Sequence, residues 1–193
     1  MYTRQVQANL PTNWGEFIIY AYGSSQDDAL PHIAMVHQTT DFNAPVPVRI
    51  HSECITGDLF GSRKCDCGEQ FRSSMDIIGT SGGVLIYLRQ EGRGIGLIHK
   101  LNAYNLQELG YDTIEANVHL GFEPDQRDFD IAIDILTDLG ISNIDLITNN
   151  PDKISAIDKS NITLNSRIPM VIQPKVENEN YIRVKQDVLG HLL

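Results

Sequence analysis

Short apolar runs separated by turn-forming residues mark the first part of the chain. Residues 16–22, 32–37 and 47–51 combine apolar with β-branched or aromatic side chains, a pattern typical of strands. The segment between the first two runs, 23–28, reads Gly-Ser-Ser-Gln-Asp-Asp and is a turn-rich break. We therefore predict three strands here, of which the first two pair antiparallel.

The rest of the chain alternates between helix and strand patterns. Helical periodicity ends at a glycine in three segments, 70–78, 97–109 and 128–139. Strand patterns are found at 83–88, 143–148 and 169–173. Asn150 and Pro151 should begin a short helix, and residues 179–193 a terminal one. We predict one α/β domain over residues 1–193, with a mixed β-sheet flanked by helices.

Composition and charge narrow the classes of partner. With 41% hydrophobic residues, a chain of 193 residues can bury a core of its own. A net charge of −10 disfavours binding to nucleic acid or to an anionic membrane, because both require a broad basic face. No apolar run approaches the roughly 20 residues of a membrane span, and the N-terminus has no signal-peptide pattern. We expect a cytoplasmic protein without a membrane partner, whose few basic residues gather at one site if it binds a polyphosphate.

The three cysteines of the chain, Cys54, Cys65 and Cys67, lie close together in sequence. Three thiolates suit zinc, and a site with three protein ligands leaves the fourth position to water, as catalytic zinc sites do. Two alternatives stay open. His51 could complete a closed structural site, or the cysteines could pack without a metal, although the charged residues around them argue against ordinary core packing.

Two segments frame these cysteines: 49–58, Arg-Ile-His-Ser-Glu-Cys-Ile-Thr-Gly-Asp, and 65–68, Cys-Asp-Cys-Gly. Together they resemble the zinc-binding signature of the GTP cyclohydrolase II family. The likeness covers essentially the whole chain and continues through further segments, 89–97, 103–107, 125–129, 148–153 and 190–191. It leaves no room for the dihydroxybutanone phosphate synthase domain of some relatives, so the chain resembles the monofunctional form.

The resemblance implies a zinc-dependent hydrolysis of GTP, the first step of riboflavin biosynthesis. Water adds at C8 of guanine, the imidazole ring opens, and formate and diphosphate leave, giving 2,5-diamino-6-(5-phospho-ribosylamino)pyrimidin-4(3H)-one. Zinc on the three cysteines would lower the pKa of its water, and Mg²⁺ would accompany the phosphates. The family usually forms homodimers. The alternatives are a related cyclohydrolase that stops at the formamidopyrimidine, and a non-catalytic, zinc-stabilised regulatory protein.

The resemblance also implies three catalytic residues, Asp125, Tyr104 and Arg127. Asp125 would accept a proton, and the Tyr104 hydroxyl would face the zinc water or the opening ring. Arg127 would attack the α-phosphorus as a nucleophile, although a protonated guanidinium is better suited to stabilising charge. From the residues alone, Asp125 could instead cap a helix, Tyr104 could be a core residue, and Arg127 could form a surface ion pair with Asp125 or Asp128.

A further set of residues is expected to bind the substrate on the strength of the same resemblance: Arg49, Ile50, His51, Ser52, Glu53, Gln70, Glu91, Gly92, Arg93, Thr113, Thr148 and Lys153. A carboxylate is the natural partner of the N1 and N2 donors of guanine, and Glu53 or Glu91 could supply it. The glycines of residues 92–96 would allow close approach of a backbone, but their spacing fits neither a Walker A loop nor a dinucleotide fingerprint.

Overall fold

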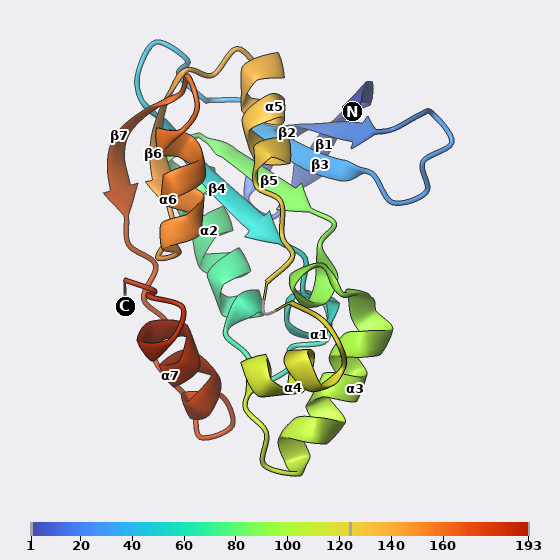
Figure 1. The fold of residues 1–193 in the computed structure, drawn as a ribbon. Coiled ribbons are helices and arrows are strands. Elements are labelled where there is room, and N and C mark those ends of the chain that lie inside the picture. The colour runs from blue at the N-terminus through green and yellow to red at the C-terminus, as the bar shows by residue number, and fades with distance from the viewer. Residues whose placement is uncertain (1, 124, 193) are drawn as a thin grey trace.

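A seven-stranded mixed sheet in the order β1-β2-β3-β5-β4-β6-β7 runs through this computed structural model, which describes residues 2–123 and 125–192 (Figure 1). The strands are β1 (Thr3–Thr12), β2 (Gly15–Gly23), β3 (His32–His37), β4 (Val46–Ser52), β5 (Val84–Leu88), β6 (Asn143–Ile147) and β7 (Thr163–Ile168). Pairing is antiparallel from β1 to β5 and parallel from β5 through β4 and β6 to β7. The predicted α/β class, mixed sheet and antiparallel β2–β3 pair are confirmed.

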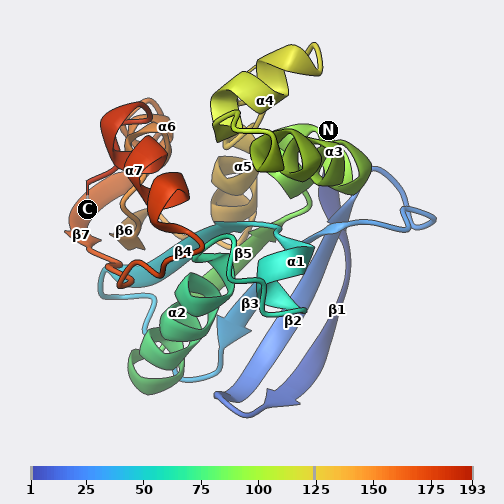
Figure 2. The same cartoon turned by 90° about the horizontal axis from the view of Figure 1, so that it is seen from below.

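Helices cover both faces of the parallel part of the sheet. They are α1 (Ile55–Asp58), α2 (Cys67–Ser81), a 3₁₀ turn η1 (Glu91–Gly94), α3 (Gly96–Glu108), α4 (Thr113–His119), α5 (Asp130–Asp138), α6 (Pro151–Asp158) and α7 (Glu179–Asp187). Figure 2 shows α2 on one face and α5 and α6 on the other. Beyond the carboxyl ends of β4 and β5 lie α3, α4 and α7 (Figure 1).

Two apolar clusters hold these layers together. Alternate residues of the central strand β5 point to opposite faces, so Ile86 packs with Ile135 of α5 while Leu85 packs with Met75 of α2. All four side chains are at most 1% exposed. This explains why β5 is a continuous apolar run, as expected for a parallel strand buried on both sides. The clusters fix the positions of the strand ends that carry the site.

Most predicted elements are present, with some corrections. The start of α6 is as predicted, since the Asn150 side chain accepts a hydrogen bond from Asp152 N at 2.7 Å and Pro151 opens the helix. The strand predicted at 169–173 is wrong. The last strand is β7, a largely polar edge strand, whereas the backbone of Met170 bonds to the side chain of Asn149. The terminal helix ends at Asp187, well before residue 193.

Strand β1 and helix α4 were not predicted, nor were the one-turn elements α1 and η1. Strand β1 has seven exposed residues among its ten and, within the described residues, pairs with β2 alone, so no clear apolar run marks it. Helix α4 is short, but its start carries a capping box in which Asp112 and Glu115 exchange hydrogen bonds with each other's backbone. Along residues 2–123 and 125–192, no helix has the length and apolar character needed to cross a membrane.

Candidate active site

The candidate site lies beyond the carboxyl ends of β4 and β5 and consists of two adjoining pockets. The cysteine pocket is lined by residues that include Cys54, Cys65, Cys67, Glu91, Arg93, Lys100, Tyr104 and Thr113. The basic pocket is lined by residues that include Arg49, His51, Gln70, Thr148, Asn150, Lys153, Lys185 and His191. Ser52, Cys67, Arg127 and Tyr181 line both. The two pockets can therefore hold the two ends of one ligand.

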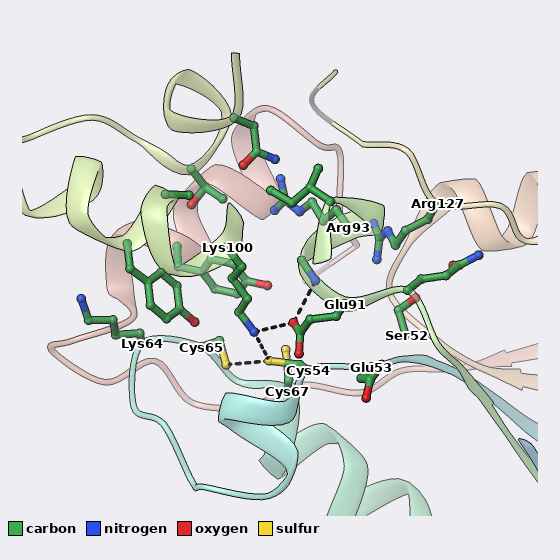
Figure 3. Close-up of a pocket in the computed structure, with 18 of the residues that line it drawn as sticks. Ser52, Glu53, Cys54, Lys64, Cys65, Cys67, Glu91, Arg93, Lys100 and Arg127 are labelled. Carbon is green, nitrogen blue, oxygen red and sulfur yellow. Dashed lines mark hydrogen bonds and ion pairs between the residues drawn. The ribbon is translucent and has the colours of Figure 1, made fainter. Parts of the chain in front are cut away.

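Cys54 follows β4, whereas Cys65 and Cys67 lie at the start of α2 (Figure 3). Their sulfur atoms all lie within 4.8 Å of one another, and those of Cys54 and Cys65 are 3.6 Å apart. Sulfur ligands about 2.3 Å from a tetrahedral zinc lie about 3.8 Å apart, so this donor set fits zinc. Gly57 makes room for the cluster, because a Cβ there would lie 2.9 Å from the Cys65 sulfur.

His51 lies outside the cysteine cluster. Both oxygens of Asp58 lie 3.1 Å from its Nε2, and Asp58 Oδ2 also accepts hydrogen bonds from Cys54 N and the Tyr87 hydroxyl. Burial lowers the pKa of His51, although its hydrogen bond to Asp58 opposes the shift. Within the described residues the metal-ligand cluster therefore comprises cysteines alone, which disfavours the closed site with His51 as fourth ligand.

Lys100 connects the cysteine cluster to Glu91 (Figure 3). Its Nζ donates to Cys54 Sγ at 3.1 Å and to Glu91 Oε1 at 2.7 Å, and Glu91 Oε2 accepts from Ile55 N at 2.6 Å. Hydrogen bonds from the Cys65 and Cys67 thiols, together with the Lys100 ammonium, lower the pKa of Cys54. These contacts favour the thiolate form of Cys54, the form that binds metals, whereas hydrogen bonds to Cys54 raise the pKa values of Cys65 and Cys67.

Tyr104 lies one helical turn after Lys100, and both side chains face the cysteine pocket. The Tyr104 hydroxyl is 3.3 Å from Thr56 Oγ1, and the Nζ of Lys64 lies 5.0 Å from the centre of its ring. Leu101 on the same helix is 45% exposed. The apolar positions of this helix therefore do not pack into the core as a core face would. Tyr104 lines the cysteine pocket instead.

Asp125 and Arg127 form a partly buried ion pair. Arg127 Nε donates to Asp125 Oδ1 at 2.9 Å, and Nη2 donates to Oδ2. Burial alone would raise the pKa of Asp125, but the hydrogen bonds and charge of Arg127 hold it below its usual value. Burial likewise opposes protonation of Arg127, but Asp125 raises the pKa of the guanidinium above its usual value. Both groups are therefore charged at neutral pH.

The glycine-rich loop holds this pair in place. Gln126 N donates to Arg93 O at 3.0 Å, and a Cβ on Gly94, which has φ +95°, would lie 3.1 Å from Gln126. Arg93 itself has φ +62°, a left-handed conformation that is unusual for a residue with a side chain. The backbone at Gly94 therefore packs closely against the segment that carries Asp125 and Arg127.

Two cations of the basic pocket, Arg49 and Lys153, have no carboxylate partner among the described residues. Arg49 donates to Ile147 O at 3.0 Å and to Gln70 Oε1 at 2.6 Å, and Lys153 Nζ donates to Ile50 O at 2.8 Å. Neither forms an ion pair with any residue in the described ranges. Burial lowers the pKa of Arg49 to about 10 and that of Lys153 well below its usual value.

The remaining predicted residues are placed as follows. Ser52, Glu53, Glu91, Gly92, Arg93 and Thr113 line the cysteine pocket, and Gln70 and Thr148 line the basic pocket. Ile50 lines neither pocket, and its side chain is fully buried in the core, so only its carbonyl faces the site, through Lys153. Asp125 also lines neither pocket and reaches the site through Arg127.

The sequence analysis did not predict several of the side chains that line the two pockets. These are Lys64, Lys100, Asn117, Asn150, Tyr181, Lys185 and His191. Lys100 had a usable signal, because it lies four residues before Tyr104 and so on the same helical face. Lys185 and Tyr181 are likewise four residues apart on α7. Nothing in the local pattern shows that α7 folds back over the start of α2.

Fold and site define an α/β protein with a candidate thiolate metal centre beside a cationic pocket. Residues 3–169 match the model of the GTP cyclohydrolase II family, and the chain belongs to that family. It is 50% identical over 192 residues to the riboflavin biosynthesis protein RibBA of Bacillus subtilis (strain 168), covering 98% of this chain and 48% of the relative. It is 47% identical over 191 residues to the RibBA of Chlorobium phaeovibrioides (strain DSM 265 / 1930), covering 98% and 46%.

The chain thus spans about half the length of the curated relatives that it matches. Among solved structures, RibBX from A. baumannii, a two-domain 3,4-dihydroxy-2-butanone 4-phosphate synthase, aligns with a TM-score of 0.45 and 19% identity. That alignment covers 89% of this chain and 40% of the other.

Proposed function

We propose that this chain hydrolyses GTP as a GTP cyclohydrolase II, opening the imidazole ring and releasing formate and diphosphate in riboflavin biosynthesis. One observation carries the proposal: a cluster of three cysteine sulfurs adjoins, at the same strand ends, a pocket in which two buried cations have no carboxylate partner among the described residues. A nucleoside triphosphate has a matching shape, with a base to be attacked at one end and negative charge at the other. Membership of the family and the names of the relatives support it.

Cys54, Cys65 and Cys67 would hold zinc, which in such a site acts as a Lewis acid that activates water for attack on C8. Around that position the chain supplies the Tyr104 hydroxyl and the Lys100 ammonium, both in the cysteine pocket. Tyr104 would donate a hydrogen bond to the opening ring or pass on a proton. Retention of this hydroxyl favours the full reaction over one that stops at the formamidopyrimidine.

Arg127 would bind the α-phosphate and stabilise charge on the transferring phosphorus. Its ion pair with Asp125 keeps the guanidinium protonated, which is suited to electrostatic stabilisation and unsuited to nucleophilic attack. Binding of a phosphate would draw Arg127 away from Asp125. The carboxylate would then regain basicity and serve as the proton acceptor, so substrate binding itself would prepare the base.

The phosphates would enter the basic pocket. Arg49 and Lys153 would pair with phosphoryl oxygens, and Thr148, which is 1% exposed, would donate its hydroxyl. Mg²⁺ bridging the diphosphate oxygens would share the remaining charge. Gln70 bonds to Arg49 and would orient it. We propose these residues as phosphate ligands, together with His51 of the basic pocket, Arg93 of the cysteine pocket and Ser52, which lines both.

Guanine would lie in the cysteine pocket between the strand ends and α3. Glu91 already accepts hydrogen bonds from Lys100, Ile55 N and Gly92 N, so its role would be to order the loop around it. Glu53 has one ionic partner, Arg89 at 3.0 Å, and is the freer carboxylate for the guanine N1 and N2 donors. Thr113 would contribute a hydroxyl from the start of α4. A homodimer stays a prediction.

The test is to incubate the zinc-loaded chain with GTP and Mg²⁺ and to measure formate, diphosphate and the diaminopyrimidinone by chromatography and mass. All three products are expected. A formamido nucleotide without formate would favour the enzyme that only opens the ring. Unchanged GTP in a folded, zinc-loaded sample would contradict the proposal and leave the regulatory alternative.

A further inference from the structure

The C-terminal segment forms one wall of the basic pocket, although it lies beyond residues 3–169 that match the family model. Two contacts, to Asp66 and Asn149, fix the segment over the pocket, and a third, between His191 and Lys185, lies within the segment. Lys185 Nζ lies 2.8 Å from Asp66 Oδ1, His191 N donates to Lys185 O at 2.9 Å, and Leu192 N donates to Asn149 O at 2.9 Å. Figure 1 shows α7 beside the segment that follows α1 and leads into α2.

Buried charge in this pocket does not balance within the described residues. Four cations line it, Arg49, Arg127, Lys153 and Lys185, and all four are largely buried. Only two of them have a carboxylate partner: Arg127 pairs with Asp125, and Lys185 with Asp66. Buried charge without a partner is costly, so the pocket is built for an anion with more than one negative charge.

Unpartnered polar atoms in the same pocket support this reading. Asn150 is 3% exposed and its Nδ2 donor has no hydrogen-bond partner, and the buried Arg49 Nε also has none. These are donors, as an anion site requires. Burial, together with the charges of Lys185, Arg127 and Lys153, lowers the pKa of the neighbouring His191 to about 3, which reflects the same excess of positive charge.

Lys185 is placed to bind such an anion directly. Its ammonium has three donors, and the hydrogen bond to Asp66 uses one of them. Because Asp66 stands between Cys65 and Cys67, the same side chain links the anion pocket to the loop of the cysteine cluster. Tyr181, one turn earlier, lies against the Lys185 ammonium, 5.1 Å from ring centre to Nζ, and lines both pockets.

We propose that Lys185, flanked by His191, is a direct phosphate ligand, so that the C-terminal segment supplies part of a diphosphate-binding subsite. The inference deepens the proposed function, on which it rests for the identity of the nucleotide. The inference makes a prediction of its own, that the chain binds inorganic diphosphate, and this can be tested without turnover of GTP.

The experiment measures the affinity of the whole zinc-loaded chain for inorganic diphosphate by calorimetry, for the unchanged protein, Lys185→Met, Lys185→Arg and Asp66→Asn. Zinc content and thermal melting of each variant are measured alongside. We expect Lys185→Met to weaken diphosphate binding about 10-fold or more and Lys185→Arg to restore most of it. Asp66→Asn should strengthen binding, because it frees the Lys185 ammonium from its carboxylate.

A purely structural role predicts another pattern, in which Asp66→Asn and Lys185→Met weaken binding equally by breaking the same ion pair. That result, or unaltered binding in Lys185→Met, overturns the proposal. Arg183→Met is the matched control, because Arg183 is exposed on the same helix and bonds only to Asn180 in the described structure. If the chain turns over GTP but binds no diphosphate, this inference is contradicted and the proposed function is not. If diphosphate binds in a manner that depends on Lys185 but GTP is not turned over, the proposed function is contradicted and this inference is not.

Discussion

The two pockets differ in how their buried cations are paired: Lys100 beside the cysteines has a carboxylate partner, whereas Arg49 and Lys153 of the basic pocket have none in the described part of the chain. In the cysteine pocket, Lys100 lies between the Cys54 sulfur and the Glu91 carboxylate. In the basic pocket, Lys153 donates to the carbonyl oxygen of Ile50 and meets no carboxylate among the described residues. One pocket provides a balanced environment for a metal, and the other is left with excess positive charge.

This difference teaches how each ligand is recognised. A balanced network is stable before any substrate arrives and can hold its metal throughout turnover. An unbalanced pocket is costly when empty, and this cost is relieved when an anion enters. The free energy of the phosphate contacts is thus available for binding and for positioning the base over the metal.

The largest effect is expected from removing a thiolate. Cys65→Ser leaves two thiolates, and since changes around metal ligands already cost about 10–100-fold, loss of a ligand should lower GTP turnover by more than about 100-fold. Metal analysis of the purified variant should show little zinc. Ser25→Ala, in the exposed loop after β2, is the control. Full zinc content with normal turnover in Cys65→Ser would remove the cysteines from the metal centre.

The basic pocket should respond to charge removal in two opposite ways. Lys153→Met should raise KM for GTP about 10-fold or more, because a charged phosphate contact is lost. In the absence of nucleotide it should raise the free energy of unfolding by about 1 kcal/mol, because an amino group that is buried without a carboxylate partner disappears. Steady-state kinetics and urea unfolding measure the two effects. A variant that is less stable and binds GTP normally would show that Lys153 is structural.

Removing a lysine from the balanced pocket should have the opposite effect on stability. Lys100→Met leaves Glu91 without its ammonium, so the free energy of unfolding should fall by about 3 kcal/mol. Zinc affinity, measured by competition with a chelator, should fall about 10-fold or more because Cys54 loses its donor. Lys159→Met, at an exposed position, is the control. Equal stability changes in Lys100→Met and Lys153→Met would abolish the contrast between the pockets.

Sequence alone was sufficient for the layers of the fold and for the cysteine cluster. Central strands such as β5 are continuous apolar runs, and the cysteines are close in sequence. It failed where tertiary pairing decides, as in β7, a polar edge strand that is held by its register with β6. The pairing of charges in the site could not be predicted from the sequence either, because partners such as Lys185 and Asp66 are 119 residues apart.

The glycine loop tests whether the two pockets communicate through Asp125 and Arg127. Gly94→Ala places a Cβ 3.1 Å from Gln126, closer than ordinary contact, and should lower kcat/KM about 10-fold by displacing this pair. Gly96→Ala is the matched control, since φ is +82° there and no atom lies within 4 Å of the added Cβ. Both variants carry a backbone strain of about 1 kcal/mol, visible in thermal melting. Equal kcat/KM in the two would mean that the loop contact does not position the pair.

The smallest effect expected is the uptake of a fraction of a proton when the basic pocket fills. Burial and the charges of Arg49, Arg127 and Lys185 hold the pKa of Lys153 well below its usual value. Above that lowered pKa the free amine is neutral, and a bound phosphate raises its pKa, so binding should take up a proton. Calorimetry of diphosphate binding over a series of pH values in buffers of different ionisation enthalpy measures the uptake, which Lys153→Met should abolish. Uptake that persists in Lys153→Met would assign the proton to another group, such as His191. The group that responds to the anion would then lie on the side of the pocket formed by the C-terminal segment.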